Sequence, residues 1–307
     1  MTDSTKLFAP ICLFVYNRFE HTKFVIDALL KNKESEFTDL IIYADGPKKD
    51  SSEDTLNKIA KLRSYLNAIT GFKTVKIIEN SQNLGLAKSI IRGVTETLRN
   101  YENIIVMEDD LVCSPYFLQY MNDGLNFYRE NEQVISIHGY TSLDTNDLPE
   151  TYLLRGADCW GWATWKRGWA IFDENGKRLL EELKRKKLGK KFDINNTYPY
   201  MKMLKDQIEG KNNSWAIRWQ ASAFLQNKLT LYPKKSLIKN IGFDGTGVHC
   251  DVTDIFEVKL SIEPIKIEAI KTEENKAALM QLEKFNRKII PSLMFRIIRK
   301  IIKFVKY

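Results

Sequence analysis

The sequence predicts an α/β protein with a mostly parallel central sheet and helices on both faces. Strand-like and helix-like segments alternate through the first third of the 307-residue chain, and parallel strands require this order because a crossover must separate them. The strand-like segments are apolar runs, as expected of buried strands. Several of them end in polar clusters, which would lie where such sheets bind ligands.

The elements of the first third are assigned from local patterns. The helices have apolar residues at helical spacing and polar starts, as in SSEDTL, where Ser and acidic residues come first. The strands are short apolar runs that close on turn residues, as in DLIIYADG. The expected strands cover 11–17, 39–46, 73–80 and 102–110, and the expected helices cover 20–32, 51–66 and 84–99.

The pattern changes after Leu111. A helix is expected over 114–131 and a strand over 134–140, followed by an aromatic segment and a Lys-rich helix. The tail from Glu273 onward is expected to be helical, with a break or kink at Pro291 because proline lacks the amide that continues a helix. The chain shows no internal repeat and no low-complexity linker.

The composition indicates a globular protein that does not bind nucleic acid. The chain is 44% hydrophobic and 28% charged, which excludes disorder, and its length permits a sizeable core. The net charge of +8 arises in two runs without acids, with six basic residues in 184–191 and five in 292–307. The rest of the chain is therefore not basic, and a broad surface for nucleic acid is not expected.

The cysteines and the apolar segments favour a cytoplasmic protein. The cysteines are far apart and form no CxxC pair, so reduced thiols are expected rather than disulfides or a zinc site. The N-terminus lacks the long apolar core of a signal peptide. No stretch reaches the ~20 apolar residues that a membrane-spanning helix needs.

The segment IIVMEDDL at 104–111 is the strongest sign of a functional site. A buried strand runs directly into Glu108, Asp109 and Asp110, whose carboxylates repel one another unless a positive group is held there. Mg²⁺ or Mn²⁺ fits such a site, because these ions take oxygen ligands from one or two carboxylates, water and phosphate. The alternative is a solvated acidic turn that caps the next helix.

Other nucleotide-binding folds are not indicated. The first strand–helix turn, VYNRFEHT, has no glycine, so the GxGxxG motif of NAD- and FAD-binding proteins is missing. The GxxxxGK[ST] motif of a P-loop is also absent.

Four segments resemble a known family and occur in its order: ICLFVYNRFEHTKFVIDAL, IIYADGPK, NLGLAKSIIRGV and IIVMEDDLVCSPYFLQYM. They resemble GT-A-fold glycosyltransferases, in particular bacterial family 2 sugar transferases and N-acetylglucosaminyltransferase I, over roughly residues 8 to 255. GWATWKRGW and GFDGTGVHC look like acceptor-side segments of the bacterial members. The resemblance implies a nucleotide-sugar-binding half at 1–113, an acceptor-binding half at 114–255 and a helical tail at 256–307.

The resemblance also implies donor-side roles. Asp110 would bind the metal, while Glu108 and Asp109 would contact or position the ribose of the nucleotide sugar. Arg18 and Asp45 match positions around the uracil or ribose. The alternative is that Arg18 is a surface residue and Asp45 only a turn residue.

Two further residues complete the implied donor site. Lys88 lies in the NLGLAKS turn, where the nucleotide and sugar are held in the family, although it could equally be a surface residue. His249 lies in DGTGVHC, and several family members place a late histidine near the metal or diphosphate. The alternative for His249 is a structural hydrogen bond.

The catalytic base is not identified by the resemblance. An inverting transfer needs a carboxylate near the acceptor hydroxyl, and the eukaryotic enzymes carry it in a Trp-Asp-Asp-Trp segment. The comparable segment here, SWAIRWQ at 214–220, has no acid. Asp158 and Asp244 are the nearest candidates for this base. Whether the transfer inverts or retains the configuration at the sugar carbon stays open.

All six tryptophans lie between Trp160 and Trp219. Aromatic faces pack against sugar rings, so part of this set is expected to line the acceptor site, and the alternative is a core under a helix. We expect both, with Trp160, Trp162, Trp215 and Arg218 on the acceptor side.

The last segment, 292–307, alternates apolar and basic residues at helical spacing. A basic amphipathic helix too short to span a bilayer fits the membrane interface, and the alternative is a helix docked on the protein or in a dimer. We expect a peripheral protein on the inner face of the cell membrane.

The sequence therefore predicts a glycosyltransferase that uses a divalent cation and moves a sugar from a nucleotide-sugar donor, expected to be a UDP-sugar. The expected acceptor is a hydroxyl of a glycan or lipid-linked glycan in bacterial surface polysaccharide synthesis. One rival is a sugar nucleotidyltransferase, which normally carries a Gly-rich phosphate loop that is absent here. Another is a non-catalytic sugar- or lipid-binding protein that keeps the fold.

Overall fold

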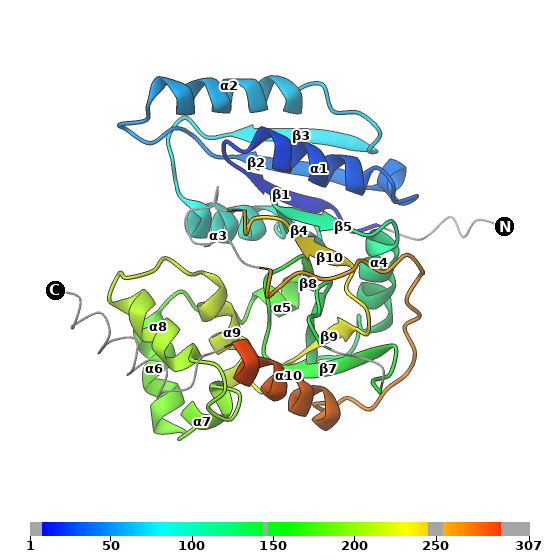
Figure 1. Ribbon diagram of the computed structural model, residues 1–307, viewed down its shortest axis with the longest axis vertical. Coiled ribbons are helices and arrows are strands. Elements are labelled where there is room, and N and C mark those ends of the chain that lie inside the picture. Colours follow the sequence, from blue (N-terminus) through cyan, green and yellow to red (C-terminus); the bar gives the residue numbers. More distant parts are fainter. Residues whose placement is uncertain (1–7, 144–146, 245–253, 290–307) are drawn as a thin grey trace.

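The computed structural model describes residues 8–143, 147–244 and 254–289, and an eight-stranded sheet forms its centre (Figure 1). The strand order is β3-β2-β1-β4-β8-β6-β9-β7. Strands β1 to β4 are parallel, whereas β8 and β7 run antiparallel to their neighbours, which confirms the predicted mostly parallel α/β class. The strands are β1 (Ile11–Val15), β2 (Asp39–Ala44), β3 (Thr74–Glu79), β4 (Asn103–Glu108), β6 (Val134–His138), β7 (Thr151–Arg155), β8 (Trp162–Trp165) and β9 (Leu229–Pro233), with β5 (Leu111–Cys113) and β10 (Ile238–Asn240) in a separate pair.

Helices cover both faces of the sheet because strand side chains alternate in direction. Ile11 and Leu13 of β1 point into one core with α1, α2 and α4, whereas Cys12 and Phe14 point into a second core against α3. The helices are α1 (Phe19–Leu29), α2 (Glu53–Leu66), α3 (Leu86–Thr97), α4 (Phe117–Phe127), α5 (Lys166–Trp169), α6 (Gly176–Arg185), α7 (Gly189–Phe192), α8 (Tyr200–Ile208), α9 (Ala216–Leu225) and α10 (Lys276–Ile289), with a 3₁₀ turn at Ser35–Phe37.

A tryptophan cluster fills the second core beneath β8. The Trp162 ring is fully buried, and the rings of Trp215 and Trp219 lie 5.5 and 5.7 Å from it. Trp169 lies 5.9 Å from the same ring. The cluster packs α5 and α9 against the sheet and accounts for the inward-packing part of the tryptophan set.

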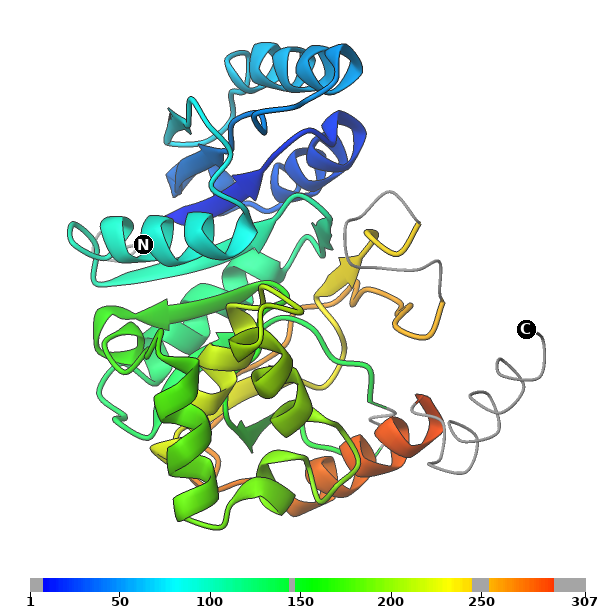
Figure 2. The same cartoon turned by 90° about the vertical axis from the view of Figure 1, so that its left-hand side faces the viewer.

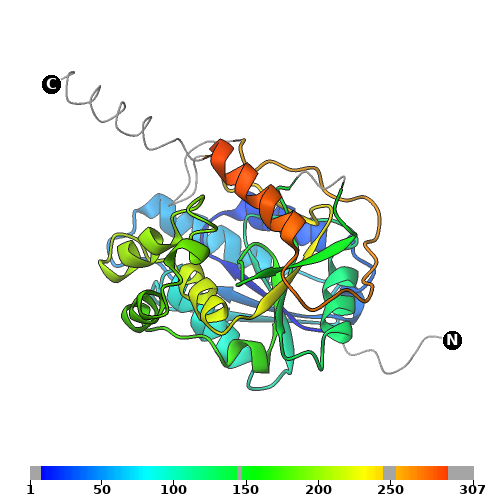
Figure 3. The ribbon, with the colours of Figure 1, turned by 90° about the horizontal axis from the view of Figure 1, so that it is seen from below.

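The C-terminal half adds a helical layer and a covering helix. Helices α6 to α9 lie together at the end of the molecule opposite α2 (Figure 2) and share a small apolar core. Helix α10 packs on β7, with Ala278 against Tyr152 and Leu154 (Figure 3). Pro291 and the predicted amphipathic segment 292–307 lie outside the described residues. None of the described helices is long and apolar enough to cross a membrane.

Candidate active site

Two neighbouring parallel strands bring a cation and three carboxylates to one sheet edge. Strands β1 and β4 pair in register, with Phe14 opposite Glu108, so the residues that follow them meet. Arg18 is the residue before α1, and its Nη2 donates to Asp109 Oδ1 and, at 2.8 Å, to Asp110 Oδ2. Three predicted site residues therefore surround one charged centre.

Burial dominates the electrostatics of the acidic triplet. It raises the pKa of Asp109 to about 6, while the Arg18 charge opposes this shift and the Asp110 charge adds to it. Burial and the charges of Asp110 and Asp109 also raise the pKa of Glu108 well above its usual range. Additional positive charge at this point would favour the ionised carboxylates, so the site favours a cation.

The segment after β10 closes over Asp110. Its Ile241 N–H donates to the Asp110 carbonyl oxygen at 2.8 Å. A Cβ on Gly242 would overlap the Asp110 carboxylate, so only glycine allows this approach. Asp244 Oδ2 lies 3.1 Å from His21 Nε2 on α1, which links the same segment to the first helix.

Asp45 is buried and its carboxylate is occupied by backbone amides. Its Oδ1 accepts from the N–H groups of Gly46 and Leu84, and its Oδ2 accepts from Gly85 N–H at 3.0 Å. These bonds fix the turn that begins α3. The predicted Lys88 lies one turn further on this helix and is exposed.

The chain returns across the sheet between β7 and β8 through residues 156–161. Trp160 N–H donates to His138 Nε2 at 3.2 Å, and His138 Nδ1 lies 2.9 Å from the Tyr140 carbonyl oxygen. A carbonyl only accepts, so Nδ1 carries the proton and the ring is neutral, in agreement with a pKa lowered by burial. Sequence reasoning missed His138, although it ends a strand as the acidic triplet does.

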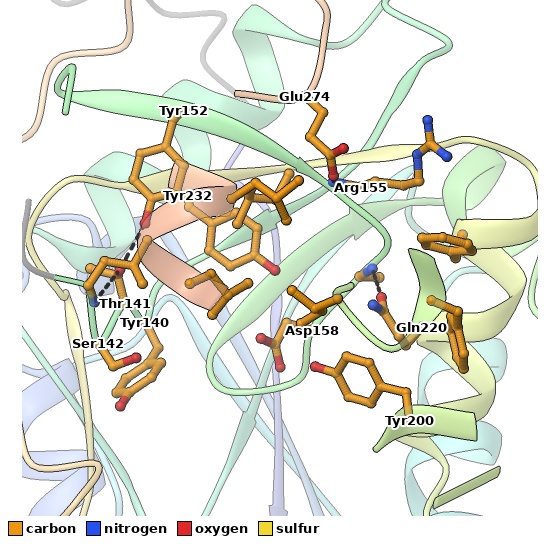
Figure 4. Close-up of a pocket in the computed structure, with 18 of the residues that line it drawn as sticks. Tyr140, Thr141, Ser142, Tyr152, Arg155, Asp158, Tyr200, Gln220, Tyr232 and Glu274 are labelled. Atoms are coloured by element: carbon orange, nitrogen blue, oxygen red, sulfur yellow. Dashed lines mark hydrogen bonds between the residues drawn. The ribbon is translucent and has the colours of Figure 1, made fainter. Parts of the chain in front are cut away.

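Asp158 lies in this crossover and links the acidic triplet to a cavity. Burial raises the pKa of the next residue, Cys159, and the charges of Asp158, Glu108 and Asp110 raise it further. Asp158 also lines a cavity of about 100 Å³ (Figure 4). Its Oδ1 accepts from Cys159 N–H and lies 3.9 Å from the neutral His138 ring.

The family model described as Glycosyl transferase family 2 matches residues 11–197, more than half of the chain. The matched part includes Arg18, the acidic triplet and Asp158. The chain belongs to glycosyl transferase family 2. This confirms the resemblance to family 2 sugar transferases, and the reaction of the family is transfer of a sugar from a nucleotide-sugar donor.

Solved structures resemble this family 2 transferase at low identity. UDP-glucose pyrophosphorylase complexed with UDP-glucose is 16% identical, with 73% of this chain and 90% of that one covered and a TM-score of 0.36. S. aureus TarS is 17% identical, with 47% of this chain and 24% of that one covered and a TM-score of 0.30. Glucosyl-3-phosphoglycerate synthase from Mycobacterium tuberculosis, in complex with Mn²⁺ and UDP, is 13% identical. The match covers 58% of this chain and 66% of that one, with a TM-score of 0.33.

The transferase thus spans about a quarter of the length of TarS. A comparison with curated proteins finds no match.

Most of the predicted acceptor residues of the transferase are buried. Trp162 is fully buried and Trp215 is 3% exposed, both within the tryptophan cluster. Arg218 is 8% exposed and donates to the backbone carbonyl oxygens of Ser214 and Glu174. These side chains are used in packing, and of the predicted set Trp160 alone is partly exposed.

The carboxylates of the transferase fit a small divalent cation. Across residues 8–143, 147–244 and 254–289, no group of three or more His, Cys, Asp or Glu side chains is arranged to hold a metal ion. Asp109 and Asp110 nevertheless direct oxygens at one cationic group, and Mg²⁺ or Mn²⁺ needs only one or two protein carboxylates. The predicted ligand His249 lies outside the described residues.

Proposed function

We propose that the chain is a metal-dependent transferase that moves one sugar from a UDP-sugar to a hydroxyl of a glycan or lipid-linked glycan in bacterial surface polysaccharide synthesis. The observation that carries this proposal is the convergence of Asp109 and Asp110 on Arg18 at the ends of β1 and β4. In a family 2 chain, this charged centre at the carboxyl edge of the sheet suits a metal-bound diphosphate.

The donor would be held by the residues around this centre. Asp110, with Asp109 beside it, would hold Mn²⁺ or Mg²⁺, which when bound neutralises charge on the departing diphosphate. Arg18 would hold the diphosphate from the side of α1, and Glu108 would contact the ribose. Asp45 would act indirectly, since its carboxylate fixes the backbone of the turn before α3.

The transfer requires a group that accepts the proton of the acceptor hydroxyl. As the hydroxyl oxygen bonds to C1 of the donor sugar, the bond from C1 to the diphosphate oxygen breaks. The nucleoside diphosphate leaves with the electron pair, and the hydroxyl proton passes to a carboxylate. Attack opposite the leaving group makes the transfer inverting.

We assign the proton acceptor to Asp158 rather than to Asp244. Asp158 lines the cavity, whereas Asp244 is paired with His21. The neutral state of His138 leaves the Asp158 carboxylate without a compensating positive charge from that ring.

In this proposal three parts of the chain have separate roles. Residues 1–113 bind the nucleotide sugar, residues 114–255 shape the acceptor site, and the tail at 256–307 ends in the membrane-binding segment 292–307. An enzyme held in this way would work at the inner face of the cell membrane, where lipid-linked glycans are assembled.

The test is a panel of UDP-, GDP-, dTDP- and CMP-sugars, with binding and hydrolysis measured in Mn²⁺, in Mg²⁺ and in chelator. We expect one UDP-sugar to bind only with metal. Because Asp110→Asn removes a carboxylate that would hold the metal at the diphosphate, it should lower turnover by about 10²- to 10³-fold. Asp27→Asn, on the exposed side of α1, is the matched control and should behave as wild type.

Donor binding that ignores both the metal and Asp110 would show that the triplet is not the donor site. Binding with metal but without transfer to any acceptor would instead identify a non-catalytic sugar-binding protein.

A further inference from the structure

The cavity beside Asp158 has two aromatic walls (Figure 4). Tyr152 of β7 and Tyr232 of β9 form one wall, with their rings stacked at 5.8 Å. Phe192 forms the other with Tyr200 and Phe224, whose rings lie 5.6 and 5.2 Å from it. Aromatic walls of this kind suit the C–H faces of sugar rings.

Three polar groups face one another between these walls. The hydroxyls of Tyr200 and Tyr232 point toward Asp158 (Figure 4). Burial, followed by the Asp158 charge, raises the pKa of both tyrosines, so both hydroxyls stay protonated. Among the described residues neither hydroxyl has a hydrogen-bond partner. Two donors and one carboxylate acceptor are therefore available to a ligand with several hydroxyls.

The charges that line the cavity balance. Asp158 and Glu274 are acidic, whereas Arg155 and Lys191 are basic. A ligand with its own carboxylate would gain no net attraction from this lining. The balance favours a neutral sugar over a uronic or sialic acid.

A path of contacts leads from Asp158, which lines the cavity, to the acidic triplet. Asp158 leads through Cys159 to Trp160, whose ring lies 5.6 Å from that of Phe243. Phe243 follows Gly242, which lies against the Asp110 carboxylate. Packed side chains of the crossover and of the segment after β10 therefore connect the cavity lining with the acidic triplet.

We infer that this cavity binds a neutral pyranose of the acceptor, with Tyr200 and Tyr232 as specificity-determining residues. The inference rests on the proposed function and adds the class of acceptor. Helix α10, which lies beyond the part matched by the family model, covers this site with Leu279 and Leu282. The choice of acceptor sugar would thus depend partly on α10, which lies outside residues 11–197.

The experiment measures sugar binding without donor, by saturation-transfer NMR and titration with methyl glycosides of glucose, galactose, N-acetylglucosamine and glucuronic acid. We expect a neutral glycoside to bind and the glucuronide to bind at least tenfold more weakly. Because two hydrogen bonds are lost, Tyr200→Phe combined with Tyr232→Phe should weaken binding by about tenfold. Tyr128→Phe, which removes a buried hydroxyl without a partner elsewhere in the described structure, should not.

Wild-type donor binding, measured in parallel, separates the two proposals. If the donor binds with metal but no neutral glycoside binds, the cavity is not an acceptor site although the proposed function stands. Preference for the glucuronide, or equal affinity of the double variant and wild type, would also overturn the inference. If no donor binds, the proposed function fails, and glycoside binding lost in the double variant would still support the cavity as a sugar site.

Discussion

Gly242 shapes the acidic site by having no side chain. Its N–H donates to Asn240 Oδ1 at 2.7 Å, which holds the backbone against Asp110. Any Cβ at this position would occupy the space of the Asp110 carboxylate. The carboxylate also pairs with Arg18, so its position is set from two sides.

Gly242→Ala should therefore damage activity more than stability. A displacement of a positioned group by about 1 Å can cost about 10²-fold in rate, and we expect a loss of 10- to 100-fold in turnover. The unfolding midpoint should fall by only a few degrees, because the clash is with a side chain at the edge of the site.

The control for this variant is Gly189→Ala, because a Cβ there would meet only the Met201 side chain at ordinary contact distance. Equal activity of Gly242→Ala and wild type would show that the Asp110 carboxylate is not needed where it lies.

At the scale of elements, the crossover 156–161 carries Asp158, which lines the cavity, and Trp160, which bonds to His138. Gln220 Oε1 accepts from Ala157 N–H at 2.6 Å, and Thr230 Oγ1 donates to the Gly156 carbonyl oxygen at 2.7 Å. Its other end is held by His138 through Trp160 N–H. Because His138 must stay neutral to accept this bond, the crossover depends on pH.

The expected pH dependence follows from the pKa of His138. In the unfolded chain this histidine takes up a proton near pH 6.5, whereas burial lowers its pKa in the folded protein. The contribution of neutral His138 to the stability of the fold is therefore complete above about pH 6.5. It is lost as the pH falls toward the lower pKa of His138 in the folded protein. Urea unfolding measures this effect. Between pH 7 and pH 5 the free energy of unfolding should fall less for His138→Gln than for wild type.

Imidazole ¹⁵N spectra give a direct check on His138. They should show the Nδ1-protonated neutral ring at pH 6, and protonation of His138 at pH 6.5 or above would contradict this account.

At the scale of the whole molecule, one sheet carries both halves of the site. The parallel strands β1 to β4 bring Arg18 and the acidic triplet to their carboxyl ends, and β6 to β9 extend the same sheet toward the cavity. A membrane contact through 292–307 would add to this arrangement without altering it, because the described core ends with α10.

Deletion of residues 290–307 should abolish binding to vesicles that contain anionic lipid. Each basic residue near such a surface contributes about 1 kcal/mol, and the segment 292–307 carries five of them. Vesicle flotation of the full chain and the shortened chain measures this directly, with neutral vesicles for comparison.

Lys186→Ala combined with Lys187→Ala alters the other basic run and serves as the charge control. If this variant loses vesicle binding and the shortened chain keeps it, the membrane contact lies in the α6 region.

The sequence by itself determined the α/β class, the order of the first elements and the residues at the strand ends. These depend on local patterns, since the βα order sends the ends of all parallel strands to one edge. The meeting of Arg18 with Asp109 and Asp110 also needs β1 and β4 to be neighbours, which the sheet order provides. The predicted strand 11–17 ends at Val15 because the next residues turn toward α1.

Only the tertiary structure decided which polar and aromatic residues are open to a ligand. Trp162 and Trp215 are buried by packing between segments far apart in the chain, and the Asp45 carboxylate is occupied by amides of the turn before α3. The approach of Gly242 to Asp110 joins residues on distant segments. Such contacts leave no periodic signal in the sequence, because they depend on how the packed elements meet.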